Sequence, residues 1–260
     1  MSRIEALPRM SFGAHLEELR RRLFRSILAL LLTTCVAFSF HKELFSIATI
    51  PQRRAHAMFD PPLPVTFIPR DYVAPVQALI KLSLLLGLLG ASPVIGWQVW
   101  AFVGAGLYAR ERRWALAFGI CSFLLFLIGC AAGYFCLIPY TLYGLASMLP
   151  LDRVLPTFEL AGYLDLLMTL TVALGGVFQL PLAMAFLTRI GLVEPRSWGR
   201  WRKHGVVGNV VLAAVLAPGD PLSLAAFAAP LLVLYEVGAL AARFCAPAPP
   251  AALAGGIVQM

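Results

Sequence analysis

The chain has 260 residues, of which 60% are hydrophobic and only 13% are charged, and its mean hydropathy is +0.82. A soluble globular domain is about half apolar, and 13 acidic residues are too few to coat a water-soluble surface of this size. The net charge of +8 does not indicate a nucleic-acid partner, because the basic residues fall in short clusters between apolar runs rather than in one patch. The composition therefore predicts an integral membrane protein.

The residue types that carry catalysis or bind metals form no functional pattern. The four histidines are scattered over the connectors, and there is no Ser/His/Asp set, HExxH motif or glycine-rich phosphate loop. The five cysteines lie in or beside apolar runs, without the spacing of a zinc site or a disulfide framework. We therefore expect neither an enzyme nor a bound cofactor or metal.

Apolar runs of helical length follow one another along the chain. No small-residue cleavage site follows the first run, so we expect it to remain in the protein. Pro93 and Pro181 lie inside the second and fourth runs, and Pro93 predicts a kink in the second run. The sequence predicts one all-α membrane domain over residues 1–260, with a disordered cytoplasmic tail over 246–260. The expected spans are residues 23–40, 74–103, 114–140, 163–188, 206–217 and 222–242.

The distribution of Lys and Arg predicts the orientation of these spans. Basic clusters before the first span and in the loops after the second and fourth spans fall on one side of the membrane. The other side includes a long polar connector, residues 41–72, which holds five prolines and fewer basic residues. Because Lys and Arg are enriched on the cytoplasmic side, we expect both termini to be cytoplasmic.

The fifth apolar run, residues 206–217, is unusually short. Twelve residues in a helix cover about 18 Å, against a hydrocarbon core of about 30 Å. The run therefore either spans a locally thinned bilayer or forms a re-entrant hairpin with the run that follows. We favour two short spans, because Arg243 closes the sixth run as a cytoplasmic anchor would.

Glu17 and Glu18 lie in the segment that enters the first span, His15 to Leu23. Arginines in this position orient the span, but glutamates add nothing to that function. On a helix Glu18 and Arg22 are four residues apart and lie away from the apolar face, so a solvated ion pair worth about 0.2–0.5 kcal/mol is one interpretation. A ligand-binding role for Glu18 is the other, while Glu17 is interpreted as a solvated charge.

Glu111 is the only acid in a loop with three arginines, on the same predicted side as Glu18. Charge balance within the loop is one explanation. The other is that two carboxylates at the cytoplasmic ends of adjacent spans bind a ligand with paired guanidinium groups, because a carboxylate accepts the two parallel bonds of an arginine fork.

Polar and aromatic residues at the ends and centres of spans are further candidates. Gln98, Trp100 and Phe102 end the second span, where an interfacial aromatic belt is the simpler interpretation. Gln179 lies within the fourth span and requires a polar partner, which a neighbouring helix can supply.

Three further charged residues lie near the ends of other spans. Lys81, near the outer end of the second span, is expected to snorkel toward water. Asp220 lies in the turn between the two short spans, where a turn or capping role is expected. Glu236 lies late in the sixth span, where an acid is costly and therefore a candidate contact.

Five of these segments resemble, in order, the motifs of the TatC family, the multi-spanning subunit of the twin-arginine protein translocase. The first is His15-Leu16-Glu17-Glu18-Leu19-Arg20-Arg21-Arg22-Leu23, and the second is the end of the second span, Ser92 to Phe102. The others are the loop from Tyr108 to Arg113, the segment from Gly176 to Pro181, and the region from Pro218 to Gly238. The resemblance covers nearly the whole chain.

The resemblance implies a concave, glove-like bundle of six spans with short fifth and sixth spans, located in the bacterial cytoplasmic membrane. It implies that Glu18 and Glu111 receive the paired arginines of signal peptides on folded substrate proteins, with Arg20, Trp100 and Phe102 at neighbouring motif positions. It further implies transport driven by the proton-motive force, in an oligomeric complex with TatA-type and TatB-type single-span subunits. Gln98, Gln179, Asp220 and Glu236 are the expected intramembrane polar or partner contacts.

The chain departs from the family at two positions. Gln179 replaces a membrane-embedded glutamate of many members and cannot titrate, and the loop after Phe102 lacks the usual proline. The alternative functions are a secondary transporter of a small solute and a scaffold without a substrate. A transporter would have an ionisable site near the midplane and repeated span patterns, and neither is evident in the sequence.

Overall fold

The computed structural model describes residues 12–69, 71–105, 109–150, 157–217, 219 and 221–246. Asp220 and all of the expected tail except Ala246 lie outside these residues. Within them the chain is helical apart from short connections and two short parallel strands, β1 (Phe67–Ile68) and β2 (Phe158–Glu159). The helices are α1 (Phe12–Ser39), α2 (His41–Ala48), α3 (Ile50–Ala57), α4 (Ala74–Ala105), α5 (Ala109–Ala132), the π-helix η1 (Gly133–Leu137), α6 (Ile138–Ser147), α7 (Leu160–Val177), α8 (Leu180–Arg189), α9 (Pro195–Arg200), α10 (Arg202–Leu216) and α11 (Pro221–Phe244).

Five helical segments of the described chain are long and apolar enough to cross a membrane: Gly13–Ser39, Ala74–Ala105, Ala117–Ser147, Leu160–Arg189 and Ser223–Phe244. They correspond to the first four predicted spans and the sixth, and together they confirm an all-α membrane protein. The predicted fifth span corresponds to α10, whose 15 residues cover about 22 Å. The count of six spans and the cytoplasmic termini therefore stay predictions.

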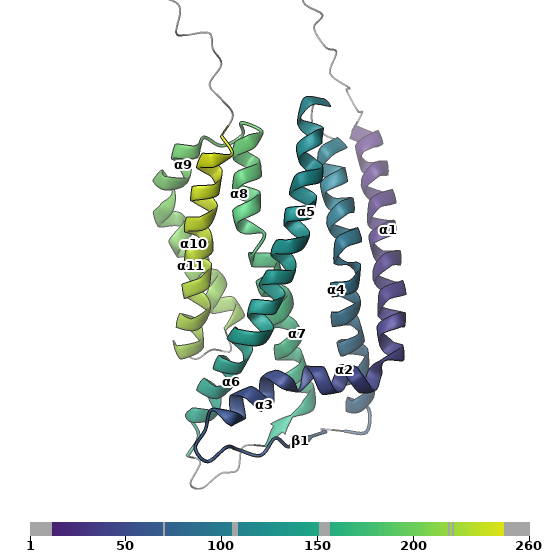
Figure 1. The fold of residues 1–260 in the computed structure, drawn as a ribbon, viewed down its shortest axis with the longest axis vertical. Coiled ribbons are helices and arrows are strands. Elements are labelled where there is room, and N and C mark those ends of the chain that lie inside the picture. The colour runs from purple at the N-terminus through teal and green to yellow at the C-terminus, as the bar shows by residue number, and fades with distance from the viewer. Residues whose placement is uncertain are drawn as a thin grey trace, which may run out of the picture.

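The connector after the first span is more ordered than the sequence indicates. It forms α2 and α3, which run across the lower ends of the long helices (Figure 1). Leu44 and Ala48 on α2 are buried in the main apolar core, and α3 buries Gln52 and His56. Pro51 lies in the first turn of α3, where its missing N–H removes no helical bond. Tertiary packing stabilises these short helices, so the sequence alone gives only a weak signal for them.

Two of the long segments are interrupted. The third segment passes from α5 to α6 through the π-helix η1, just before Pro139. The fourth segment breaks between α7 and α8 at Phe178 and Gln179, two residues before Pro181. Pro93, by contrast, lies inside α4, which continues to Ala105. At this break the Gln179 N–H donates to the Gly176 carbonyl (3.0 Å), three residues earlier rather than four.

Glycine and threonine side chains allow the long helices to approach closely. Thr33 Oγ1 on α1 donates a hydrogen bond to the Gly87 carbonyl on α4 (2.7 Å). A methyl group at Gly87 would lie 2.7 Å from Thr34 Cα and 2.8 Å from Thr34 N. Gly175 on α7 packs in the same way against Phe126 and Cys130 of α5. Small residues at such contacts are typical of helix packing in membranes, where there is little hydrophobic driving force between helices.

Candidate functional site

The side chain of Glu18 is buried between α1 and α4. It is only 9% exposed, although α1 otherwise presents mostly apolar side chains outward. Arg22, one turn later, donates to Glu18 Oε1 through Nε (3.0 Å) and Nη2 (2.5 Å). Nη1 of the same guanidinium lies 3.4 Å from Gln98 Oε1 on α4. The ion pair of Glu18 and Arg22 that the sequence indicates therefore exists, but it lies in the α1–α4 interface rather than on a solvated face.

One oxygen of the Glu18 carboxylate remains available. Both bonds from Arg22 end on Oε1, and Oε2 is buried without a hydrogen-bond partner among the described residues. Leaving a buried polar atom unsatisfied costs about 1–3 kcal/mol, and more for a charged group. Glu18 Oε2 is therefore a negatively charged hydrogen-bond acceptor that a donor on another molecule can satisfy.

Phe102 and Trp100 lie on different sides of α4. The Phe102 ring stacks on His15 of α1, with ring centroids 4.4 Å apart, one turn before Glu18. Trp100 packs against Phe118 of α5 and Phe186 of α8, at 5.3 and 4.9 Å. The structure thus brings Phe102 and Gln98 to the α1 side with Glu18, while Trp100 packs inside the bundle and fixes the end of α4 against α5 and α8.

Arg20 and Glu17 pair with each other away from this interface. The Arg20 Nη1 and Glu17 Oε2 atoms are 3.8 Å apart, and both side chains are more than 70% exposed. Exposed pairs of this kind contribute about 0–1 kcal/mol. Glu17 is therefore a solvated charge, as the sequence indicates.

Glu111 lies in the first turn of α5, and its side chain is outside the described residues. Its position follows from neighbouring contacts, because Phe118, seven residues later on α5, touches Trp100 of α4. Seven helical residues span about 10 Å. The backbone of Glu111 is therefore near the same end of the bundle as Gln98 and Phe102.

Gln179 lines a cavity of about 550 Å³ between α4, α5, α7 and α8, which also contacts Trp100. Its Nε2 donates to the Ser122 carbonyl (3.0 Å), and its Oε1 accepts from the Ser122 hydroxyl (2.7 Å). Both polar ends of the amide are thus used in joining the α7–α8 break to α5. This geometry matches the interpretation of Gln179 as a residue that forms hydrogen bonds between helices.

The acid in the last span and the lysine in the second span both have partners. Glu236 Oε1 on α11 accepts from Arg202 Nε on α10 (2.5 Å), beside a hydrogen bond from the Tyr235 hydroxyl to the Trp198 carbonyl (2.9 Å). Lys81 Nζ on α4 lies 2.5 Å from Asp165 Oδ1 on α7. Asp165 was not predicted from the sequence, although an acid near the end of an apolar run indicates that a basic partner lies nearby.

Comparison with known proteins identifies the family. The family described as "Sec-independent protein translocase protein (TatC)" matches residues 14–230. The chain belongs to the TatC family. It is 36% identical over 229 residues to the Sec-independent protein translocase protein TatC of Azotobacter chroococcum, covering 88% of each chain. It is 33% identical to the protein of the same name from Escherichia coli K12, covering 88% of this chain and 87% of that one.

A solved structure supports the same assignment. The crystal structure of the twin arginine translocase receptor TatC superimposes with a TM-score of 0.76 at 33% identity. The match covers 89% of this chain and 99% of the solved chain. The resemblance noted from five sequence motifs is thereby confirmed at the level of the family and of the fold.

Proposed function

We propose that this protein is the membrane core and signal-peptide receptor of a twin-arginine protein translocase in the bacterial cytoplasmic membrane. It binds the paired arginines of signal peptides on folded substrate proteins and takes part in their transport across the membrane, driven by the proton-motive force. Its partners are TatA-type and TatB-type single-span subunits, in an oligomeric complex. The names of its relatives, a Sec-independent translocase protein and a twin arginine translocase receptor, support this assignment.

The unsatisfied oxygen of Glu18 is the observation that carries the proposal. Arg22 neutralises the carboxylate but occupies only Oε1, and Oε2 remains buried without a partner among the described residues. A guanidinium from a signal peptide can donate to Oε2 while the Arg22 pair holds the carboxylate in position. A hydrogen bond to a charged group contributes about 1.5–3 kcal/mol.

The second arginine is assigned to Glu111. A twin-arginine motif presents two guanidiniums on neighbouring residues, so it requires two carboxylates at one end of the bundle. α4 packs on α1 through Phe102 and His15, and on α5 through Trp100 and Phe118. Trp100 and Phe102 therefore act as positioning residues that set the distance between the two helices bearing the glutamates.

The remaining candidates have supporting roles in the proposal. Arg20 is exposed on α1 and is proposed as a contact at the rim of the site. Gln98 holds Arg22. Gln179 and Glu236 are engaged within this chain, so contacts to partner subunits there would add to existing bonds. Asp220, which precedes α11 in the sequence, is proposed as a partner contact.

Charge substitutions test the clamp. Glu18→Lys or Glu111→Lys is expected to abolish export of a twin-arginine reporter while leaving membrane insertion intact, whereas Glu17→Lys, one residue away and solvated, is expected to retain export. In a binding assay with purified protein, Glu18→Gln is expected to weaken an Arg-Arg signal peptide about tenfold to 150-fold, from the loss of one charged hydrogen bond.

A matched peptide distinguishes this function from its alternatives. A signal peptide with Lys-Lys in place of Arg-Arg lacks the planar guanidinium fork. Its affinity for the wild-type chain is expected to be no higher than the affinity of the Arg-Arg peptide for the Glu18→Gln variant. Equal retention of both peptides would indicate a scaffold or a solute transporter. Normal export by both lysine variants would refute the assignment of the two glutamates.

A further inference from the structure

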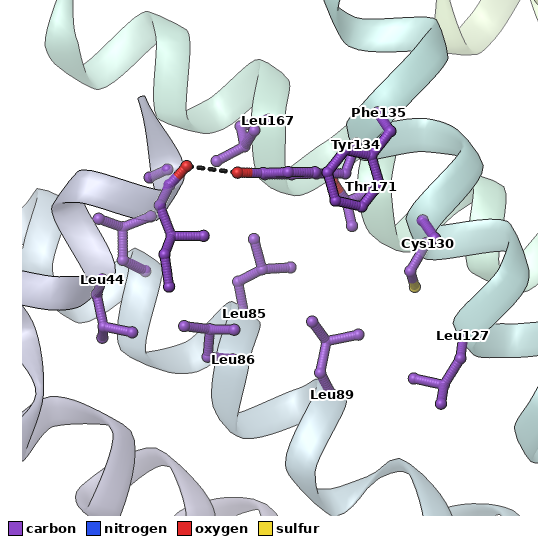
Figure 2. A pocket seen from close by; sticks show the side chains of 14 residues that line it. Leu44, Leu85, Leu86, Leu89, Leu127, Cys130, Tyr134, Phe135, Leu167 and Thr171 are labelled. Carbon is purple, nitrogen blue, oxygen red and sulfur yellow. Dashed lines mark hydrogen bonds between the residues drawn. The ribbon is translucent and has the colours of Figure 1, made fainter. Parts of the chain in front are cut away.

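A second cavity lies at the opposite end of the bundle from Glu18, where α2 crosses α4 and the α5–η1 segment. Its volume is about 230 Å³, and leucines from α2, α4, α5 and α7 make up half of the residues that line it (Figure 2). The Tyr134 hydroxyl, which lines it, is already used in a hydrogen bond to the Ile47 carbonyl, drawn as the dashed line in Figure 2. The cavity is therefore a largely apolar space with its principal polar group already satisfied.

The cavity extends into the membrane-spanning part of the protein. Leu85 and Leu89, on its α4 wall, lie 11 and 15 residues from the first residue of α4, or about 16 and 22 Å along the helix. At its edge, Ile47 and Phe135 are 46% and 49% exposed. The cavity thus reaches the surface at the end nearest α2 and has apolar walls at depths where lipid, rather than water, surrounds the chain.

A cation lies at the open edge. The Arg54 guanidinium on α3 is 5.2 Å from the centroid of the Phe135 ring, and it forms no ion pair within the described ranges. The neighbouring Arg53 donates through Nη2 to Thr49 Oγ1 (2.8 Å) and to the Ser46 carbonyl (3.3 Å). Two adjacent positive charges thus border an apolar cavity at the predicted non-cytoplasmic surface, with no carboxylate in salt-bridge range among the described residues.

The chemistry of the cavity and of its mouth indicates the occupant. The walls are almost entirely apolar, and the Arg54 guanidinium lies against Phe135 at the edge. Apolar walls and a cation at the mouth match the two ends of a phospholipid, because each buried methylene contributes about 0.8 kcal/mol and a guanidinium forms strong bonds to phosphate oxygens.

We propose that this cavity binds an anionic phospholipid of the non-cytoplasmic leaflet, with one acyl chain between α2, α4 and η1 and its phosphate on Arg54. The lipid fills the space beneath α2 and fastens the α2–α3 layer to the bundle. This site is separate from the signal-peptide site, and its test does not depend on export.

Lipid retention by the purified full-length chain tests the headgroup contact. In native mass spectrometry, phosphatidylglycerol is expected to be retained about tenfold more than phosphatidylcholine with the same acyl chains. Both lipids carry the phosphate, but the choline ammonium cancels its charge, and each arginine near a membrane surface contributes about 1 kcal/mol of attraction to an anionic lipid. Arg54→Gln is expected to lower phosphatidylglycerol retention to the level of phosphatidylcholine. Lys42→Gln, which removes one positive charge from exposed α2, is the matched control and is expected to retain the preference.

Two cavity variants test the acyl chain. Leu89→Phe fills the cavity and is expected to reduce retention of both lipids, whereas Ile80→Phe, at an exposed position of α4, is expected to leave it unchanged. Thr171→Val replaces a buried hydroxyl that has no hydrogen-bond partner among the described residues, so it is expected to maintain or increase retention if hydrocarbon fills the cavity. A loss of binding in Thr171→Val would indicate a polar occupant and overturn the proposal.

Unchanged phosphatidylglycerol retention in Arg54→Gln would also overturn the proposal, as would full retention in Leu89→Phe. Each variant is first compared with wild type by circular dichroism and size-exclusion chromatography. If Leu89→Phe does not fold, Arg54→Gln and Thr171→Val, which change no core volume, decide the outcome.

Discussion

Replacing Gly87 by alanine is expected to separate α1 from α4. The added methyl group would meet the Thr34 hydroxyl and would lie 2.7 Å from Thr34 Cα and 2.8 Å from Thr34 N, so backbone as well as a side chain is in the way. Overpacking of this kind costs about 1–3 kcal/mol. A shift of α1 also weakens the bond from Thr33 Oγ1 to the Gly87 carbonyl, worth about 0.5–1.5 kcal/mol.

Alanine's better helix propensity offsets about 0.8–1.0 kcal/mol of this cost, which leaves a net loss of about 0.5–3.7 kcal/mol. Gly96→Ala is the matched control on the same helix, because a methyl group there meets nothing within 4 Å. Unfolding of the purified variants in detergent, followed by circular dichroism, measures both. We expect a lower midpoint for Gly87→Ala and an equal or higher one for Gly96→Ala.

The functional consequence is also measurable. Glu18 and Arg22 on α1 face Gln98 on α4, so a displaced α1 should weaken binding of an Arg-Arg signal peptide in Gly87→Ala but not in Gly96→Ala. Wild-type stability of Gly87→Ala, or equal destabilisation of the two variants, would refute the close packing of α1 on α4.

Three further substitutions have defined outcomes. Lys81→Met is expected to lower stability by up to about 1 kcal/mol more than the double variant Lys81→Met/Asp165→Asn, because the single change leaves the 60% exposed Asp165 carboxylate without this partner; a double-mutant cycle with no coupling would contradict this. Gln179→Ala is expected to cost about 1–3 kcal/mol because it removes both hydrogen bonds between Gln179 and Ser122, as measured by unfolding in detergent. Glu236→Gln is expected to change stability by less than about 1 kcal/mol, because its pair with Arg202 is 47–62% exposed, and any difference should vanish at high salt.

Local sequence patterns predicted much of this architecture. Hydropathy located five segments that the structure shows as long apolar helices, because a membrane span requires about 20 consecutive apolar residues whatever surrounds it. Pro181 lies in the predicted fourth span, but the break beside Gln179 was not predicted. Helix α4 runs continuously through Pro93, and the kink expected there stays a prediction. The ordered motifs from His15 to Gly238 predicted the family, which the comparisons confirm.

Contacts between segments that are far apart in the sequence could not be predicted from local patterns. Helices α2 and α3 were missed because they are only eight residues long and depend on burial against the bundle. The pairing of Lys81 with Asp165 joins residues 84 positions apart. Hydropathy and helical spacing within single segments carry no information on such a contact.

The sequence by itself determined that this protein is helical, lies in a membrane and carries charged residues at one end of its first span. These properties depend on composition and on spacing within single helices. Only the tertiary structure decided that Glu18 is buried with one free oxygen, and that Phe102 and Trp100 lie on opposite sides of α4. The direction in which a helical residue faces its neighbours depends on which helix packs beside it, and that choice is made by the whole bundle.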